Sequence, residues 1–180
     1  MELHTLFMSS NIRYNMNTSI NLYISNLYIK YRGLPHAHIV YRYATGPDRG
    51  NKEDVIKFMD SLITARFPDL IDLDASDAEK AEYDEYVDLI RSKMLHKCSD
   101  SVNGCTDQNG NCKKRYDQTV IREQSDIDEK GFPQYKRLSK RDLLVVPHNK
   151  NILLDWKGHA NLEYCGSALT IIYLYKVCYK

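Results

Sequence analysis

The sequence predicts an α+β fold in which a central antiparallel sheet carries a His-x-His strand, helices flank the sheet, and a Cys/His-rich loop is inserted. Three observations predict this class. Short apolar and aromatic runs have the length and the bounding turns of strands. Two longer segments repeat apolar residues at helical spacing behind capping residues. A Gly-, Asn- and Asp-rich segment after them contains three of the five cysteines.

Length and composition describe a single globular domain. A chain of 180 residues can bury one core but leaves no room for a second large domain. The 25 basic and 24 acidic residues nearly cancel, but residues 51–93 hold six basic and twelve acidic residues, so a nucleic-acid surface would come from the first and last thirds. No apolar run is long enough for a membrane span and no signal peptide is evident, so we expect an intracellular protein.

The N-terminal residues 1–21 have no sustained periodicity, and we expect a poorly specified lead-in that does not belong to the fold. The expected domain therefore comprises residues 22–180. Its first strands are expected at Leu22–Ile24 and Leu27–Ile29, the second leading toward the His-x-His strand.

His36 and His38 lie one residue apart at the start of an apolar, strand-like run. Side chains alternate between the two faces of a strand, so the two histidines point the same way. Pro35 suits the first position of a strand, and Gly33 allows a tight turn before it. Two imidazoles on one face provide half of a metal site, whereas the alternative interpretation is a structural or surface pair.

Two amphipathic helices are expected in the acidic middle of the chain. Asn51 can cap the first, which runs until Pro68 prevents continuation. Ser76 begins the second with a capping-box pattern, and its apolar stripe includes Tyr83 and Tyr86. Tyrosines on such a stripe are predicted to pack in the core rather than to act as nucleophiles.

Four shorter elements are expected in the last third. Residues 143–146 end at a proline and are typical of a strand, and residues 152–154 form a short apolar run. Residues 159–164 alternate as a half-buried strand, and Ser167 can cap a last helix that reaches residue 180.

The cysteine-bearing segment, residues 96–116, concentrates four soft or borderline metal ligands: His96, Cys98, Cys105 and Cys112. A Cys3His set can close a structural zinc site with no open position. The spacing is not that of a common zinc finger, so free thiols in a loop are the alternative. A bound zinc ion would order the loop and present three consecutive basic residues to a phosphate backbone. These are Lys113, Lys114 and Arg115.

Several of these motifs together resemble the Helitron transposases. The resemblance covers about residues 28–180, and it is carried by the run RGLPHAHIVYRY at residues 32–43, by residues 94–98, by residues 131–135, by residues 145–149 and by LLDWKGHANLEYC at residues 153–165. The C-terminal run IIYLYKVCYK resembles the family's tyrosine helix. The family also carries a His-Cys-Cys-Cys segment at the position of the cysteine cluster.

The resemblance implies a rolling-circle replication-initiator nuclease that nicks and joins single-stranded DNA at transposon ends. In that family a His-x-His pair, here His36 and His38, holds Mg²⁺ or Mn²⁺. The nucleophile would be Tyr173, with Lys176 one turn away to stabilise the developing charge, and the product would be a 5′-phosphotyrosine. Two further ligand candidates lie on the strand before the tyrosine helix, and four residues are candidates for DNA binding. The ligands are Glu163 and His159; the DNA-binding residues are Arg32, Lys113, Lys114 and Arg115.

The sequence also departs from the family pattern. Val177 stands where a second nucleophilic tyrosine is expected, and Tyr28 stands where an acidic residue is usual. If the register is shifted, Tyr175 and Tyr179 would serve instead of Tyr173. No phosphate-binding loop of a helicase occurs, so we expect a fragment or decayed copy of a transposon reading frame, located in the nucleus. The alternatives are an inactive DNA-binding relic and a zinc-stabilised interaction module.

Overall fold

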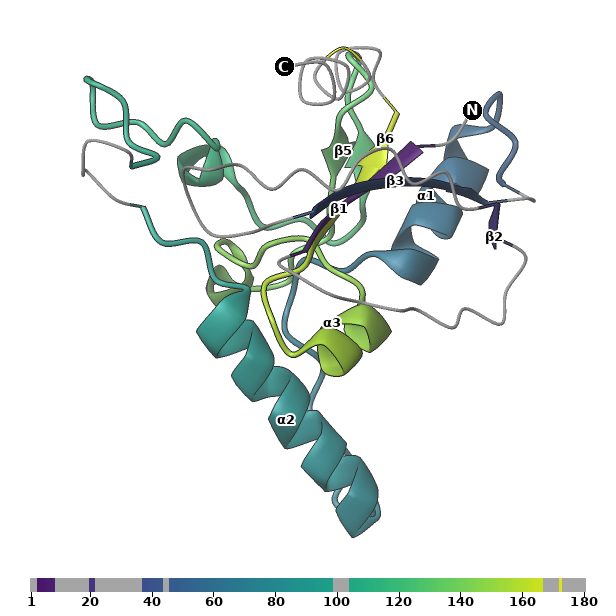
Figure 1. Cartoon of the computed structure of the whole chain (residues 1–180), viewed down its shortest axis with the longest axis vertical. Coiled ribbons are helices and arrows are strands. Elements are labelled where there is room, and N and C mark those ends of the chain that lie inside the picture. The colour runs from purple at the N-terminus through teal and green to yellow at the C-terminus, as the bar shows by residue number, and fades with distance from the viewer. Residues whose placement is uncertain are drawn as a thin grey trace.

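The computed structural model describes Leu3–Met8, Ile20–Asn21, Ala37–Tyr43, residues 46–98, residues 104–166 and Ile172. It is a mixed helix-and-strand fold with a small antiparallel sheet and a Cys/His cluster (Figure 1). Among the described residues, no helix combines the length and the hydropathy needed to cross a bilayer.

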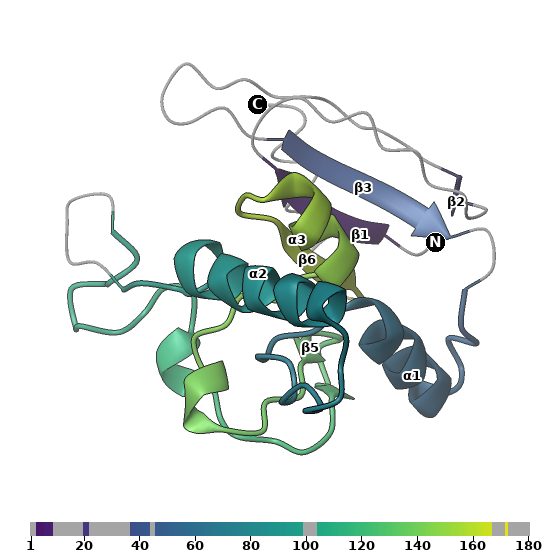
Figure 2. The same ribbon diagram turned by 90° about the horizontal axis from the view of Figure 1, so that it is seen from below.

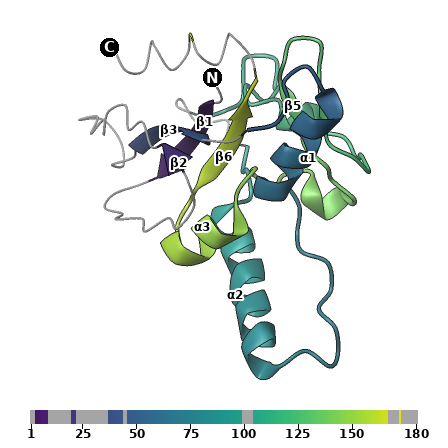
Figure 3. The same ribbon diagram turned by 90° about the vertical axis from the view of Figure 1, so that its right-hand side faces the viewer.

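The sheet has four strands in the order β2-β3-β1-β6, and every neighbouring pair is antiparallel. The strands are β1 (Leu3–Met8), β2 (Ile20–Asn21), β3 (Ala37–Tyr43) and β6 (Asn161–Cys165). In Figure 3, β6 runs from α3 up alongside β1. The first and last strands of the described chain are therefore hydrogen-bonded neighbours.

The N-terminal residues differ from the expected lead-in, because β1 pairs with both β3 and β6. The run LHTLFM contains no Gly or Pro and is mostly apolar, so it is compatible with a central strand once partners are supplied from elsewhere in the chain. Those partners lie far away in sequence, which is why local periodicity gave no sign of the strand. The proposed domain boundary at residue 22 has no independent support.

The first two helices form as expected from their caps. Asn51 accepts hydrogen bonds from the backbone N–H groups of Glu53 and Asp54 at the start of α1 (Lys52–Leu62). Ser76 and Glu79 form a reciprocal capping box at the start of α2 (Asp77–Lys93). The two expected helices are thus confirmed.

The third helix, α3 (Lys150–Trp156), joins two hydrophobic clusters. Its Ile152 packs with α1, Leu162 and Tyr164, while the neighbouring Leu153 packs with α2 and Val145. Figures 1 and 2 both show α3 between α2 and the sheet. Burial of these two adjacent side chains in different clusters ties the sheet to the long helix.

The strand expected at residues 143–146 does not form. A short 3-10 helix, η2 (Lys140–Asp142), occupies the approach, and the backbone N–H of Val145 bonds to the carbonyl of Asp142 at 2.9 Å. Only one isolated bridge, Leu95 to Val145, remains of the expected ladder. Val145 and Val146 are buried, whereas Leu144 is exposed, and the turn bonds prevent an extended run.

A second, smaller layer lies beyond β6. It consists of the 3-10 helix η1 (Tyr116–Gln118) and the hairpin of β4 (Asp126–Ile127) with β5 (Pro133–Gln134). Several expected features lie outside the described residues. These are the strands at 22–24 and 27–29 and the helix at 167–180, of which only Ile172 is described, as helical.

Candidate metal centre and adjoining groove

The four candidate ligands predicted from their spacing come together in space. The Nε2 atom of His96 lies 3.4 Å from the Sγ of Cys98, 3.4 Å from the Sγ of Cys105 and 3.3 Å from the Sγ of Cys112. All four ligand atoms are within 4.8 Å of one another. His96, Cys98, Cys105 and Cys112 therefore form a group that could hold one metal ion.

The distances fit a tetrahedral site. With a metal–nitrogen bond of about 2.0 Å and a metal–sulfur bond of about 2.3 Å, tetrahedral geometry places nitrogen and sulfur ligands about 3.5 Å apart. The three distances of 3.3–3.4 Å in the cluster are close to this value. A disulfide would require two sulfur atoms to approach to about 2.05 Å, and these cysteines are free.

A small hairpin brings two of the cysteines to the cluster. Thr106 and Cys112 form an antiparallel bridge, and the backbone N–H of Lys113 bonds to the carbonyl of Cys105 at 2.6 Å. Asp107 closes the turn by accepting hydrogen bonds from the backbone N–H groups of Asn109 and Asn111. The Asn- and Gly-rich composition of this loop therefore has a structural cause.

The backbone after Cys112 stabilises the thiolate form of that residue. Burial raises the pKa of the Cys112 thiol, but hydrogen bonds from the backbone N–H groups of Tyr116 and Lys114 lower it, and the net shift is downward. In contrast, desolvation and then the hydrogen bonds of Cys112 and Cys105 raise the pKa of Cys98 to about 11. A cation in the cluster would favour the ionised form of all three thiols.

The surroundings of His96 orient its ring and favour the neutral imidazole. Its ring stacks on Tyr116, with centroids 4.1 Å apart and planes 10° apart, and its backbone N–H bonds to the carbonyl of Leu144 at 2.8 Å. Desolvation, followed by the positive charge of Lys114, lowers the pKa of His96. The neutral imidazole is the form that binds a metal.

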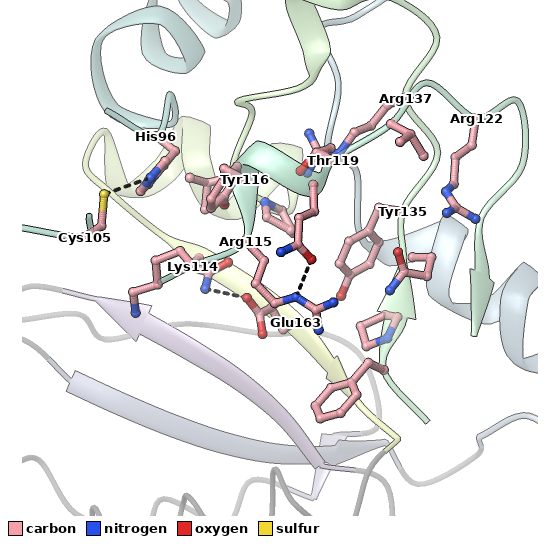
Figure 4. Close-up of a pocket in the computed structure, with 18 of the residues that line it drawn as sticks. His96, Cys105, Lys114, Arg115, Tyr116, Thr119, Arg122, Tyr135, Arg137 and Glu163 are labelled. Atoms are coloured by element: carbon pink, nitrogen blue, oxygen red, sulfur yellow. Dashed lines mark hydrogen bonds between the residues drawn. The ribbon is translucent and has the colours of Figure 1, made fainter. Parts of the chain in front are cut away.

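A groove of about 640 Å³ extends from the cluster to β6 (Figure 4). His96 and Cys105 lie at one end and Glu163 of β6 lies along its floor, and Asn161 of the same strand also lines the groove. Its ionisable lining is mostly basic. Four of the lining residues are Lys or Arg and one is acidic: Lys114, Arg115, Arg122, Arg137 and Glu163.

The three consecutive basic residues predicted to face DNA are separated by the structure. Lys114 and Arg115 line the groove, whereas Lys113 lines a second hollow beside Asp107 and its Nζ donates to the carbonyl of Gly104 at 3.4 Å. The sequence reasoning missed Arg122, which reaches the same groove from a separate segment.

The structure brings the two candidate ligands near β6 into one groove. Glu163 accepts a hydrogen bond from Asn161 Nδ2 at 3.0 Å, and His159 Nδ1 lies 2.8 Å from the carbonyl of Lys93. The Oδ1 atom of Asn161 is buried and has no hydrogen-bond partner among the described residues. Asn161 shares a face of β6 with Glu163, and no local motif marks its side-chain oxygen as a candidate ligand.

The sheet register relates these residues to His38. Phe7 of β1 is paired with His38 of β3 on one side and with Asn161 of β6 on the other. Thr5 is paired with Glu163 in the next row of the same face. His38 and Asn161 lie on strands that have β1 between them, and strands two places apart are separated by about 9.6 Å.

Four predicted site residues lie outside the described residues: Arg32, His36, Tyr173 and Lys176.

A buried polar network next to the groove was not anticipated. Asp142 accepts hydrogen bonds from the backbone N–H groups of Phe67, Leu138 and Ser139 at 2.9–3.0 Å. Arg137 donates through Nη1 to the carbonyls of Ala65, Asp142 and Val145, and desolvation lowers its pKa. Ser139 and Asp142 form a local capping box, whereas the contacts with Phe67 and Ala65 are long-range and no local motif signals them.

His148 is a structural residue. It is fully buried, with Nε2 at 2.8 Å from the hydroxyl of Tyr86 and Nδ1 at 2.8 Å from the carbonyl of Val146. The carbonyl can only accept, so Nδ1 carries the proton and Nε2 accepts from Tyr86. The expected packing role of Tyr86 is confirmed as well.

No family model matches this chain, and no curated protein is significantly similar to it.

Proposed function

We propose that this chain is a nuclease domain that nicks and joins single-stranded DNA in the manner of the Helitron-type rolling-circle initiators, with a zinc ion in the Cys3His cluster. The observation that carries the proposal is the register of the sheet. It aligns His38, from the motif typical of these nucleases, with Asn161 in one row and sets Glu163 in the next row of that face. Asn161 and Glu163 also line the basic groove.

The residues near this row suit a hard divalent cation. Mg²⁺ and Mn²⁺ prefer oxygen ligands, which two histidines alone do not supply. Glu163 provides a carboxylate, and Asn161 provides a buried oxygen that no described residue satisfies. We therefore assign Glu163 and Asn161 to the oxygen side of the site and His36 and His38 to the nitrogen side. His159, which is exposed, remains a candidate at the rim of the groove.

The proposed reaction is a transesterification. A bound Mg²⁺ or Mn²⁺ would polarise the scissile phosphate. The Tyr173 hydroxyl loses its proton and attacks phosphorus, so a bond forms between the phenolic oxygen and phosphorus as the bond to the 3′ oxygen breaks. Lys176 stabilises the phenolate, and the 3′ oxygen takes up a proton. Reversal of the same step by a 3′-hydroxyl joins two strands without ATP.

A nicking assay tests this function. The full-length chain is incubated with Mn²⁺ and a labelled single-stranded oligonucleotide, and a covalent protein–DNA adduct is sought on a denaturing gel. Tyr173→Phe is expected to abolish the adduct, whereas Tyr175→Phe, from the alternative register, is expected to retain it. Salt-dependent binding without an adduct in the wild type would instead identify an inactive DNA-binding relic.

The zinc ion is tested separately by metal analysis. One equivalent of zinc per chain is expected after purification, because the cluster offers one nitrogen and three sulfur ligands at tetrahedral spacing. Cys112→Ser should lose the metal. Cys165→Ser is the matched control, since Cys165 is a buried cysteine of β6 outside the cluster. Equal zinc content in the two variants would contradict the assignment.

A further inference from the structure

The cationic side chains that line the groove differ in burial and in role. Arg137 lines the groove, and its Nη1 donates to three backbone carbonyls. It is buried and holds together the segments around it. Lys114, Arg115 and Arg122 are exposed or half-exposed, so their charges can meet a ligand.

Arg115 is positioned by the metal cluster. It follows Cys112 by three residues, its backbone N–H bonds to the carbonyl of Cys112 at 2.7 Å, and it adopts a left-handed conformation with φ of 61°. Its Nε donates to Gln118 Oε1 at 2.9 Å. In Figure 4 its guanidinium lies over the middle of the groove, between Tyr135 and Glu163. A left-handed arginine is uncommon and needs support from its surroundings.

Arg122 lies on the far side of the same groove. Its backbone is fixed by two hydrogen bonds with Arg137, from Arg122 N–H to the Arg137 carbonyl at 2.9 Å and back at 3.0 Å. Its half-exposed side chain makes no hydrogen bond or ion pair with any residue that the structure describes. The guanidinium is therefore a positioned cation with hydrogen-bonding capacity to spare.

The lining favours nucleic acid over an acidic peptide. Half-exposed Phe132 and Pro133 also line the groove and offer apolar surface on which an unpaired base can stack. Planar guanidinium groups suit phosphate oxygens, and the groove leads to Glu163 in the sheet. Its volume of about 640 Å³ is that of a site for a short section of one strand.

We infer that this groove binds the sugar–phosphate backbone of single-stranded DNA between Arg115 and Arg122, and that the metal in the Cys3His cluster holds Arg115 in its binding position. The inference deepens the proposed function and rests on it for the identity of the ligand. It also assigns the cluster a second task, which is to couple metal loading to the affinity for DNA.

Fluorescence anisotropy with a labelled oligo-dT of about twelve nucleotides tests the site. Arg115→Gln and Arg122→Gln are each expected to weaken binding about tenfold and to reduce the slope of log affinity against log salt by about 0.7. Lys113→Gln removes the same charge from the other side of the loop, so a change below about twofold is expected. Equal losses in all three variants would overturn the groove as the site.

Metal removal tests the coupling. Chelation should weaken binding by the wild type by about tenfold or more, but it should weaken binding by Arg115→Gln less, because the group that the metal positions is already gone. Additive effects would overturn the coupling. A polyglutamate peptide that competes as well as oligo-dT would overturn the assignment to nucleic acid.

The two proposals fail in different ways. If the wild type forms the Tyr173-dependent adduct but Arg122→Gln binds oligo-dT as tightly as Lys113→Gln, the groove assignment is wrong and the nuclease function stands. If the groove variants lose binding while no adduct forms with the wild type, the nuclease function is wrong and the groove assignment stands.

Discussion

His96 and His148 show two ways in which this chain satisfies an imidazole. His148 is enclosed in the core, and both of its nitrogens have protein partners, the hydroxyl of Tyr86 and the carbonyl of Val146. His96 is half-buried at the surface, and its Nε2 faces three thiols at 3.3–3.4 Å. The core imidazole has protein partners for both nitrogens, whereas the surface imidazole faces three thiols with which it could hold a metal ion.

The difference extends to the surroundings of each histidine. The core site is fixed by contacts between distant segments, including Asp142 with Phe67 and Arg137 with Ala65. The cluster is assembled within one loop and its flanking residues. The core should therefore depend on the protein alone, and the cluster should depend on metal.

Metal removal is expected to have the largest effect, because it should loosen the cysteine cluster and leave the core unchanged. Chelation should increase tryptic cleavage after Lys113, Lys114 and Arg115 by about tenfold or more, because the metal supplies most of the energy that orders the loop. The urea midpoint of the core should change little. Mass spectrometry of short digests measures the cleavage of the loop, and tyrosine fluorescence measures the urea midpoint of the core. Unchanged protection of the loop after chelation would show that the cluster is ordered without metal.

Asp142→Ala tests how far the core relies on its polar network. The substitution leaves three backbone N–H donors without their carboxylate and places buried Arg137 in a less favourable field, so a loss of about 3–5 kcal/mol in the free energy of unfolding is expected. Urea denaturation measures this loss, and the stability of Asp142→Asn should lie between those of the wild type and Asp142→Ala. Asp88→Ala, at an exposed ion pair with Arg91, should change stability by less than about 0.5 kcal/mol.

Acidification should weaken the core through His148. Desolvation, with a further contribution from the charge of Arg137, lowers the pKa of His148 to about 4, whereas in the unfolded chain it is about 6.5. The unfolded chain then binds more protons between these values, so this contribution is complete above about pH 6.5 and is lost as the pH falls toward 4. The full difference is about 3 kcal/mol.

The control for this effect is His148→Gln, whose side-chain amide can still donate to Val146 and accept from Tyr86. Urea midpoints of both proteins are compared between pH 7 and pH 4.5. The wild type should lose more stability than the variant over this range. Parallel curves would mean that His148 is not the titrating group.

The smallest expected effect comes from the partner of His148. Tyr86→Phe leaves the buried Nε2 without its donor, so a loss of about 1–2 kcal/mol is expected. Tyr83 packs on the same cluster, and its hydroxyl bonds no residue that the structure describes. Tyr83→Phe should therefore be nearly neutral in the same urea titration. Equal losses would assign the effect to packing rather than to the hydrogen bond.

Local signals in the sequence predicted the features that depend on neighbouring residues. Asn51 and Ser76 cap their helices within three residues of the groups they bind, and all four cluster ligands fall between residues 96 and 112. Such spacing is visible in the chain itself. The residues of the cluster and two helices could therefore be named before their positions were known.

Features that depend on distant residues were missed or misread. Asp142 binds Phe67 across 75 positions, and Arg122 enters the groove from a segment that carries no motif. The run at residues 143–146 was read as a strand from its composition, but turn bonds set by Asp142 override that preference. The pairing of Asn161 with Phe7 also joins distant segments, so the side-chain oxygen of Asn161 could not be predicted as a candidate metal ligand.

The position of β1 in the middle of the sheet has a consequence for biosynthesis. Leu3 is paired with Cys165, so β1 is synthesised well before β6, the strand with which it pairs. Closing so large a loop is slow, because the conformational entropy is lost before the hydrogen bonds between the strands form. The helices and the cysteine loop can assemble while translation continues, but the sheet is completed only after β6 has been made. A ribosome that stalls before residue 161 would release a chain with an unpaired strand, which is prone to aggregation.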